Sequence, residues 1–486
     1  MIKCGHFLRQ INAYGTCSAI CTISSIFQAN RLASFARRRF YMASTSRKNT
    51  ANLHLFATPR CEVAKWRCIV RKNSLELVLF YLAAIQIGAR VLMLNPMFPL
   101  EKRIALCQAY NADFFFTSDQ AESVAESQKC GEIFRCFFTF SDAIKQAEKI
   151  DSFGDFSVNL TQPATMTLTS GSTGLPKAVV HNVQAHLANA QGVCDLMQFG
   201  AADSWLLSLP LYHVSGQGIV WRWLTTGATL VLPGEDFYAA VNQVTHVSLV
   251  PTQVQRWLQY LQEKPTAIQT RAVLLGGAHI PLALTQALQR LGVKSYSGYG
   301  MTEMASTVFA KQSDEKNGVG QPLAGREYCL HNEEIWLRGA GLALGYWQQG
   351  RIVSLLNEQG WFATKDKGVW HDGELVISGR IDNMFISGGE NIQPEEIEKL
   401  ILQSDLVKQV FVLPVTDLEF GQRPVAIVEW REPTKSAVEN LNGFLQGRLE
   451  RFKQPVAYYE LPLNLSDGAI KVSRKTLAGW LAKQLG

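Results

Sequence analysis

The segment from residue 165 to residue 180 brings together residue types that bind phosphate groups. It is expected to form a strand, a turn rich in glycine and hydroxyl residues, a lysine and a second strand. Backbone N–H groups, hydroxyls and a cation within one loop can surround a phosphate. We therefore predict a nucleotide phosphate site at Thr169, Ser170, Gly171, Ser172, Thr173, Gly174 and Lys177.

Two other interpretations of this loop fit the sequence less well. A simple hairpin turn rarely holds five consecutive glycine or hydroxyl residues with Pro-Lys close behind them. A Walker P-loop ends in Gly-Lys-Ser/Thr and leads into a helix. Here Pro176 precedes Lys177, and residues 178–180 have the pattern of a strand. We therefore do not predict a Walker-type NTPase.

The loop and the motifs that follow it resemble the adenylate-forming superfamily, which includes acyl-CoA synthetases, luciferases and peptide-synthetase adenylation domains. The resemblance spans roughly residues 165–475 and keeps the family's order of motifs. Those motifs are Leu209-Pro210-Leu211-Tyr212-His213, Tyr296 to Glu303, Asp366 with the five residues before it, Gly379-Arg380-Ile381-Asp382, Gly388 to Glu398, and Ile470-Lys471-Val472-Ser473-Arg474.

The resemblance implies that ATP activates a carboxylic acid as its acyl-adenylate, which coenzyme A then attacks to form a thioester. Attack of a carboxylate on the α-phosphate needs cations, because both groups are negative. The implied roles are Lys471 and Thr302 at the α-phosphate, Glu303 on Mg²⁺, Tyr299 and Gly300 at adenine, Asp366 and Arg380 at the ribose, Asp382 as the hinge and His213 in the second motif. Ile470 stands where the family usually has glycine, so Lys475 is the alternative to Lys471.

Arg222 indicates which acid is activated. It lies between Trp221 and Trp223 in a mostly apolar run that is expected to be helical. One interpretation is that its stem covers apolar surface while its head reaches solvent or a structural acid. The other is that it recognises a second carboxylate on an aromatic substrate.

The segment from Leu209 to Trp223 resembles the o-succinylbenzoate–CoA ligases of menaquinone synthesis, whose substrate carries two carboxylates. The resemblance implies that the succinyl carboxylate is adenylated and that Arg222 binds the benzoate carboxylate. Further substrate contacts are implied at Ser215, Gln217, Thr252, Gly276 and Gly277. Two alternatives stay open: a fatty-acyl or aryl-CoA ligase, and a binder of nucleotide or acyl groups without catalysis.

The elements that must position these residues alternate between helix and strand. Helical periodicity over 75–87 is followed by a strand at 89–94, and later strands are expected at 114–116, 165–169, 205–209, 229–232, 247–250 and 272–275. Such alternation favours a layered α/β fold with its ligands beyond the strand ends. We predict a large domain over 71–379, a hinge at 380–382 and a small mobile α+β domain over 383–486, with helices at 394–402 and 437–451 and strands at 410–414 and 425–430.

Composition bounds the class of protein. A chain of 486 residues exceeds what one hydrophobic core supports, so two or more domains are expected. Residues 1–70 hold eleven Lys or Arg and one acid, which leaves 36 basic against 40 acidic residues beyond them. We interpret that opening segment as an organellar transit peptide or, preferably, as sequence that is not the natural start.

The same composition limits the partners. The mildly acidic body carries no basic run for nucleic acid, and the longest apolar stretch, over 77–88, is shorter than the ~20 residues of a membrane span. Scattered cysteines indicate neither zinc nor a disulfide framework. We predict a cytoplasmic enzyme of small-molecule substrates, and leave a homo-oligomer open.

Overall fold

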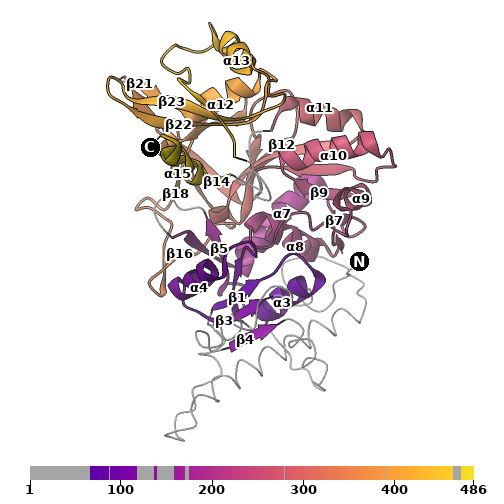
Figure 1. Ribbon diagram of the computed structural model, residues 1–486. Helices are drawn as coiled ribbons and strands as arrows, with labels where there is room; N and C mark the ends of the chain where they lie inside the picture. Colours follow the sequence, from indigo (N-terminus) through magenta and orange to yellow (C-terminus); the bar gives the residue numbers. More distant parts are fainter. Residues whose placement is uncertain are drawn as a thin grey trace, which may run out of the picture.

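The computed structural model describes residues 66–86, 88–117, 136–139, 158–169, 175–277, 280–388, 390–462 and 472–485. Two large mixed sheets form the centre of the fold, and helices pack between and around the sheets (Figure 1). The smaller C-terminal elements lie at one end of the molecule, beyond the second sheet (Figure 1).

The first sheet has eight strands in the order β17-β16-β6-β5-β2-β1-β3-β4. The strands from β4 to β5 in that order are parallel to their neighbours, whereas β5, β6, β16 and β17 pair antiparallel. Its strands are β1 (Trp66–Val70), β2 (Arg90–Leu94), β3 (Ala112–Thr117), β4 (Cys136–Thr139), β5 (Pro163–Thr169), β6 (Lys177–Asn182), β16 (Gly345–Gln348) and β17 (Arg351–Val353).

Strand β1 shows that the folded body begins before residue 71, the boundary predicted from the sequence. Trp66 and Val70 are each 1% exposed, and the strand pairs with both β2 and β3. The basic, irregular sequence ahead of it hides this short buried strand. Residues 1–65, which hold most of the unusual segment, lie outside the described part of the chain.

The second sheet has seven strands in the order β13-β12-β11-β10-β9-β7-β8. Neighbours from β8 to β11 are parallel, and the β11–β12–β13 end is antiparallel. Its strands are β7 (Ser204–Leu206), β8 (Thr229–Val231), β9 (His246–Leu249), β10 (Ala272–Leu275), β11 (Lys294–Met301), β12 (Ser306–Gln312) and β13 (Gln321–Pro322).

The main hydrophobic core lies between the two large sheets. It includes residues of α3 (Leu75–Gln86), α7 (Val183–Met197) and α8 (Val214–Thr226) together with inward-facing residues of both sheets. The outer face of the first sheet is covered by α4 (Leu100–Ala109). The outer face of the second is covered by α9 (Phe237–Asn242), α10 (Pro251–Glu263) and α11 (Leu282–Arg290).

A four-stranded antiparallel sheet leads from the large sheets to the C-terminal elements. Its order is β14-β15-β18-β19, with β14 at Arg326–His331, β15 at Glu334–Gly339, β18 at Phe362–His371 and β19 at Glu374–Arg380. The short helix η4 (Ile381–Asn383) follows directly. Beyond it come β20 (Phe385–Ser387), β21 (Glu390–Ile392), α12 (Pro394–Leu402), β22 (Val407–Asp417), β23 (Gly421–Trp430), α13 (Ala437–Leu445), β24 (Tyr458–Glu460) and α15 (Arg474–Leu485).

The C-terminal elements have a hydrophobic core of their own. One cluster joins β20, α12 and α13 to one face of the β22–β23 pair, and a second joins α15 to the other face. Two predicted elements are shorter than expected. The strand at β7 stops at Leu206 because residues 207–213 form a connecting loop, and α13 stops at Leu445 because Gln446 is extended.

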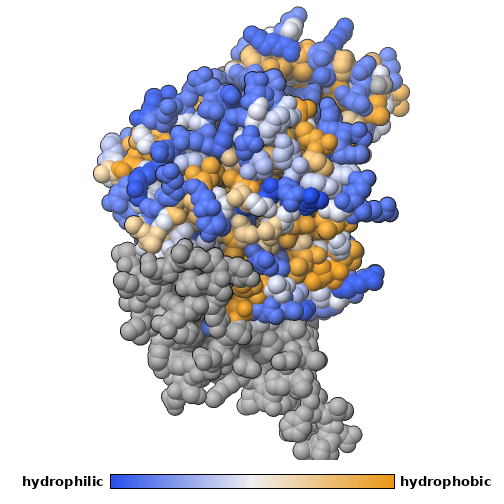
Figure 2. Space-filling model, turned by 180° about the vertical axis from the view of Figure 1, so that it is seen from behind, coloured by the Kyte–Doolittle hydropathy of each residue, from blue (hydrophilic) through white to orange (hydrophobic). Residues whose placement is uncertain are grey.

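The surface of the described residues carries both hydrophilic and hydrophobic side chains (Figure 2). Figure 2 shows that hydrophilic residues cover much of the face opposite to Figure 1, and that hydrophobic residues gather toward its lower part, beside the grey residues. None of the described helices combines the length and the apolar character that crossing a bilayer requires.

Candidate active site

The predicted phosphate loop connects two paired strands. Strands β5 and β6 form an antiparallel hairpin in which Thr169 faces Lys177. Residues 170–174, which include five of the predicted phosphate ligands, lie outside the described residues. The Lys177 side chain is exposed, and its Nζ lies 4.9 Å from the centroid of the Tyr346 ring. The lysine that the loop was predicted to contribute is therefore accessible from solvent.

Thr302 and Glu303 lie in the short helix η3 (Thr302–Met304), at the turn between β11 and β12. The hairpin closes tightly because Gly300 has no side chain: a Cβ there would lie 2.1 Å from the carbonyl oxygen of Ser306. From behind, Asn189 of α7 donates to the carbonyls of Met304 and Thr307, both at 2.9 Å. These contacts fix the backbone that presents Glu303.

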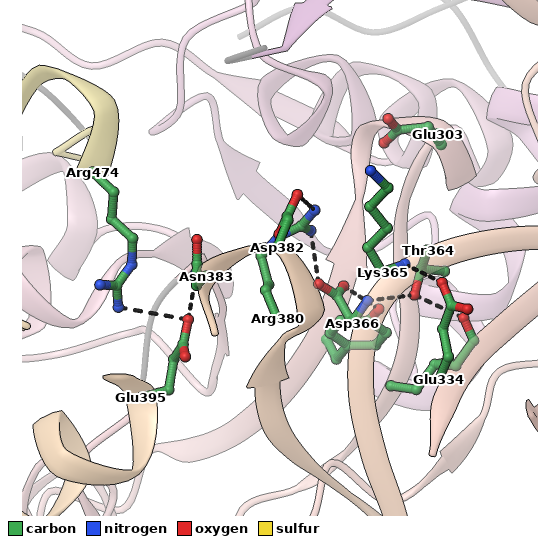
Figure 3. A network of polar contacts seen from close by, with 12 residues as sticks. Glu303, Glu334, Thr364, Lys365, Asp366, Arg380, Asp382, Asn383, Glu395 and Arg474 are labelled. Atoms are coloured by element: carbon green, nitrogen blue, oxygen red, sulfur yellow. Dashed lines mark hydrogen bonds and ion pairs between the residues drawn. The ribbon is translucent and has the colours of Figure 1, made fainter. Parts of the chain in front are cut away.

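The Glu303 carboxylate suits a magnesium ion that is shared with phosphates. Its Oε1 accepts a hydrogen bond of 2.8 Å from the Tyr346 hydroxyl, and within the described residues no cation forms an ion pair with it. Figure 3 shows the Lys365 side chain extending toward it. No group of three or more acidic, His or Cys residues that could hold a metal occurs in the described part of the chain. Mg²⁺ is commonly held by one or two carboxylates with substrate phosphates and water, so Glu303 fits this ion.

Asp366, Tyr299 and Arg380 form one hydrogen-bonded cluster. The Tyr299 hydroxyl donates to Oδ2 of Asp366 at 2.5 Å. The guanidinium of Arg380 donates to Oδ1 of Asp366 at 2.7 Å (Figure 3). Asp366 is only 7% exposed. Burial, together with the neighbouring carboxylate, raises the pKa of Tyr299 well above its ordinary value, so this hydroxyl stays a donor. Three of the four residues predicted at adenine and ribose are therefore in direct contact with one another.

The predicted hinge residue Asp382 is also bound to Arg380. Its two oxygens accept from Nε and Nη2 of the guanidinium at 2.8 and 3.0 Å. Burial alone would lower the pKa of Arg380, but the carboxylates of Asp382 and Asp366 raise it. Arg380 thus joins a strand of the large body to the start of the C-terminal elements through two acids.

Polar contacts continue from the hinge into the C-terminal elements (Figure 3). Asn383 donates to Glu395 of α12 at 2.5 Å, and Arg474 lies 3.6 Å from the same carboxylate. Lys471, the predicted catalytic lysine, lies outside the described residues. Its alternative, Lys475, is exposed in the first turn of α15.

The second motif, which ends at His213, is held by close packing. Asn73 donates to the carbonyl of Leu209 at 2.8 Å and accepts from the N–H of Leu211 at 3.0 Å. Gly216, in the first turn of α8, lets the helix approach, since a Cβ there would lie 2.1 Å from the carbonyl oxygen of Pro210. His213 itself is the residue before α8, with its ring 4.7 Å from that of Tyr212.

The remaining predicted substrate residues differ in their placement. Gln217 is fully buried and donates to Thr167 and to the carbonyl of Leu211, which indicates a role in joining β5 to the second motif. The others follow parallel strands or begin a helix, at the edge where ligands of α/β sheets bind. They are Ser215 in α8, partly buried; Thr252 in α10, exposed; and Gly276 and Gly277 directly after β10.

Arg222 is buried without an acid. Its side chain is 1% exposed, and its Nη1 donates to the hydroxyl of Ser248 at 3.3 Å. The guanidinium also lies 4.8 Å from the centroid of Trp205, while its Nε has no hydrogen-bond partner. No carboxylate of the described residues forms an ion pair with it. Burial lowers the pKa of Arg222 to about 10, so it stays charged at neutral pH.

A second buried arginine shows what structural pairing looks like in this protein. Arg326 is 6% exposed and donates to four backbone carbonyls, those of Ala188, Ala324, Asn189 and Thr307. A buried charge is costly unless it is compensated. Arg326 has its partners within the fold, whereas Arg222 has one hydroxyl and an aromatic ring. The contrast favours an anionic ligand at Arg222.

Sequence reasoning missed three residues of these clusters. Tyr346 contacts both Lys177 and Glu303, and Ser248 and Trp205 contact Arg222. None belongs to a motif that the sequence analysis used. Ser248 and Trp205 lie 26 or fewer residues from Arg222 in the sequence. Tyr346 lies 43 residues from Glu303 and 169 residues from Lys177, so the fold is needed to bring these side chains together.

The fold and these clusters have the form of an enzyme that binds ATP and activates an acid, and the comparisons agree. The family model described as AMP-binding enzyme matches residues 68–347. The chain belongs to this AMP-binding enzyme family.

Within the family, the chain is similar to enzymes named 2-succinylbenzoate–CoA ligase. The 2-succinylbenzoate–CoA ligase of Haemophilus influenzae is 62% identical over 417 residues, which cover 85% of this chain and 87% of that protein. The Escherichia coli enzyme of the same name is 44% identical over 416 residues, covering 85% and 86%. The predicted class, an AMP-forming acid–thiol ligase, is therefore confirmed.

Solved structures confirm the fold. A variant of E. coli MenE with bound OSB-AMS is 39% identical, with a TM-score of 0.77, and the match covers 94% of this chain and 92% of that one. The o-succinylbenzoate CoA synthetase of Bacillus subtilis, in complex with the acyl-adenylate intermediate OSB-AMP, is 23% identical and has the same TM-score. The predicted layered α/β architecture of an adenylate-forming enzyme is thus confirmed.

Proposed function

We propose that this enzyme adenylates 2-succinylbenzoate on its succinyl carboxylate and transfers the acyl group to coenzyme A. The products are 2-succinylbenzoyl-CoA, AMP and diphosphate, as in menaquinone synthesis. The relatives from Haemophilus influenzae and Salmonella typhimurium are named as ligases of this acid. The observation that carries the proposal is the buried Arg222, which has no acid of its own within the described residues.

The acid would lie with its two carboxylates at opposite ends of the site. The benzoate carboxylate would accept hydrogen bonds from Arg222, whose position is fixed by Ser248 and Trp205. A planar guanidinium can bind a carboxylate through two parallel hydrogen bonds. Ser215, Thr252, Gly276 and Gly277 would line the path between this end and the nucleotide. Gln217 would support the path from behind through its bonds to Thr167 and Leu211.

The nucleotide would bind at the clusters around Asp366 and Glu303. Asp366, already held by Tyr299 and Arg380, would accept the ribose hydroxyls, and Tyr299 would lie against adenine. Mg²⁺ bound at Glu303 supplies positive charge at the phosphates. Thr302, Lys177 and the loop at 170–174 would donate to the phosphate oxygens.

The succinyl carboxylate then attacks the α-phosphate, and diphosphate leaves. We assign the neutralising contact between the two anions to Lys471, with His213 near the acid. The thiol of coenzyme A can attack the resulting mixed anhydride without a protein nucleophile. Rotation of residues 383–486 against 71–379 about the hinge at 380–382 would separate the half-reactions. The Arg380–Asp382 ion pair lies within this hinge.

The cellular setting completes the proposal. We place this enzyme of small-molecule substrates in the cytoplasm, where ATP and coenzyme A are both present. Whether two copies associate would be answered by light scattering of the purified protein.

A thermodynamic cycle tests the role of Arg222. Wild type and Arg222→Leu are each assayed with 2-succinylbenzoate and with 4-oxo-4-phenylbutanoate, which lacks only the ring carboxylate. Wild type should prefer 2-succinylbenzoate by about 30-fold or more in kcat/KM, since unpairing a buried charge costs at least ~2 kcal/mol. Arg222→Leu should lose that preference. Its activity with 4-oxo-4-phenylbutanoate is the matched control, because this acid has no ring carboxylate for Arg222 to bind. A preference that persists in Arg222→Leu rules out this role.

A further inference from the structure

Tyr346 touches two groups of the phosphate site that come from distant parts of the chain. Its hydroxyl donates to Oε1 of Glu303 at 2.8 Å, and Nζ of Lys177 lies 4.9 Å from its ring centroid. A cation within ~6 Å of an aromatic centroid is attracted by the ring. One side chain thus contacts both the carboxylate assigned to Mg²⁺ and the ammonium assigned to phosphate.

The backbone around Tyr346 is anchored to the same two elements. The N–H of Ala343 donates to the carbonyl of Glu303, and the N–H of Leu344 donates to the carbonyl of Val180, both at 2.8 Å. Tyr346 then pairs with Val179 of β6, two residues beyond Lys177. Residues two apart on a strand share a face, so the ring reaches Lys177 diagonally across the pair. The contacts are therefore built into the sheet.

The Tyr346 hydroxyl is the donor in its hydrogen bond with Glu303, because a carboxylate oxygen only accepts. A fixed donor on one oxygen restricts rotation of the carboxylate and leaves the other oxygen for a ligand. Within the described residues, that second oxygen has no hydrogen bond or ion pair.

We propose that Tyr346 is a positioning residue of the ATP phosphate site: its hydroxyl orients the Glu303 carboxylate toward Mg²⁺, and its ring steadies the Lys177 ammonium. The inference rests on the proposed function, because it takes Glu303 and Lys177 as ligands of Mg²⁺ and phosphate. It assigns to the hydroxyl and the ring two separable effects. Loss of the hydroxyl should affect only binding that involves the metal.

Calorimetric titration of ATP tests this division without acid or coenzyme A. Each variant is titrated once in MgCl₂ and once in EDTA. Tyr346→Phe should weaken ATP binding about fivefold in MgCl₂, as expected for one hydrogen bond of ~1 kcal/mol, and leave it unchanged in EDTA. Tyr346→Leu, which also removes the ring, should weaken binding in both solutions.

Two further variants separate positioning from general damage. In a Glu303→Gln background, Tyr346→Phe should cause no additional loss, because its effect passes through that carboxylate. Tyr260→Phe is the matched control: its hydroxyl donates to Asp236 at 2.9 Å, remote in the fold from β6 and η3, and it should bind ATP as wild type does.

The proposal is overturned if Tyr346→Phe binds Mg·ATP as tightly as wild type, if its loss is equal in EDTA, or if its loss adds fully to that of Glu303→Gln. Because no acid is present, these results do not depend on which acid the enzyme activates. Tight Mg·ATP binding without thioester formation from 2-succinylbenzoate would instead contradict the proposed function.

Discussion

At the scale of single residues, the site depends on side chains whose charges are incompletely satisfied within the protein. Arg222 and Glu303 are the clearest cases. Each has one neutral hydroxyl partner within the described residues, Ser248 for the arginine and Tyr346 for the glutamate. Spare hydrogen-bonding capacity of this kind is what a polar ligand requires. Asp366 differs, because both of its oxygens already accept strong hydrogen bonds.

The crowding around Asp366 leads to a prediction about the nucleotide. If Asp366 binds the ribose hydroxyls, wild type should use ATP better than 2′-deoxy-ATP. Asp366→Ala should raise KM for ATP about tenfold, as expected for hydrogen bonds to a charged group. It should also use the two nucleotides equally well, with KM for the acid unchanged. Steady-state kinetics with both nucleotides checks this, and discrimination that survives in Asp366→Ala would place the ribose elsewhere.

The residue types of the site could be predicted from the sequence, but several of their contacts could not. The order of the motifs was enough to predict that Tyr299, Asp366 and Arg380 contact the same nucleoside. In the structure these residues are joined by hydrogen bonds. Tyr346 gave no such signal, because a single tyrosine has no chemical signature apart from its neighbours. Its partners become visible only when β16 pairs with β6.

At the scale of elements, tight packing of helices against loops fixes the second motif. Helix α8 begins directly after His213, and its first turn presses on the motif that precedes it. The absence of a side chain at Gly216 allows this contact. The sequence predicted the helical run but not this packing, which depends on how the loop at 207–213 folds back over the helix.

Substitution at Gly216 should therefore damage both stability and activity. Gly216→Ala would force its Cβ against the backbone of Pro210, and such overpacking costs typically 1–3 kcal/mol. Gly479→Ala is the matched control, because the space around Gly479 in α15 is open. Alanine should raise helix stability there by about 0.5–1 kcal/mol. Denaturant titration of both variants checks the opposite signs, and a neutral Gly216→Ala would contradict the packing argument.

Element boundaries show where local pattern was insufficient. The helix expected to start at residue 75 and the strands near 114, 165 and 272 occur as α3, β3, β5 and β10. Strand β1 was missed because five residues that include Arg67, preceded by basic sequence, carry little periodic signal. The sheet supplies what the pattern lacks, since β1 lies between β2 and β3.

At the scale of the whole molecule, buried histidines make stability depend on pH. His181 and His186 are 0% and 1% exposed and lie 5.0 Å apart between ring centroids, in the core beside Trp221. Burial lowers the pKa of His181 to about 4. Burial also lowers the pKa of His186, and the charge that His181 would carry lowers it further. Both are therefore neutral in the folded protein.

The sign of the effect follows from the lowered pKa values. Below pH ~6.5 the two histidines bind protons in the unfolded chain but stay neutral in the folded protein. Their contribution to the free energy of unfolding is therefore fully present above pH ~6.5 and decreases as the pH falls toward 4. Each such histidine removes about 1.4 kcal/mol per pH unit in this range. Urea titrations at pH 7.5, 6.5 and 5.5 should show the fall beginning below 6.5, and His181→Leu should reduce its slope. A slope that His181→Leu leaves unchanged would show that other groups are responsible.

One competition experiment tests directly which acid the enzyme activates. The protein is incubated with ATP, MgCl₂ and coenzyme A in the presence of equal concentrations of 2-succinylbenzoate, 4-oxo-4-phenylbutanoate, benzoate and a long-chain fatty acid. Mass spectrometry then identifies the thioesters and AMP that form. We expect 2-succinylbenzoyl-CoA as the dominant thioester, with AMP in an amount equal to the total thioester. A dominant fatty-acyl or benzoyl thioester, or ATP left unconsumed, would contradict this expectation.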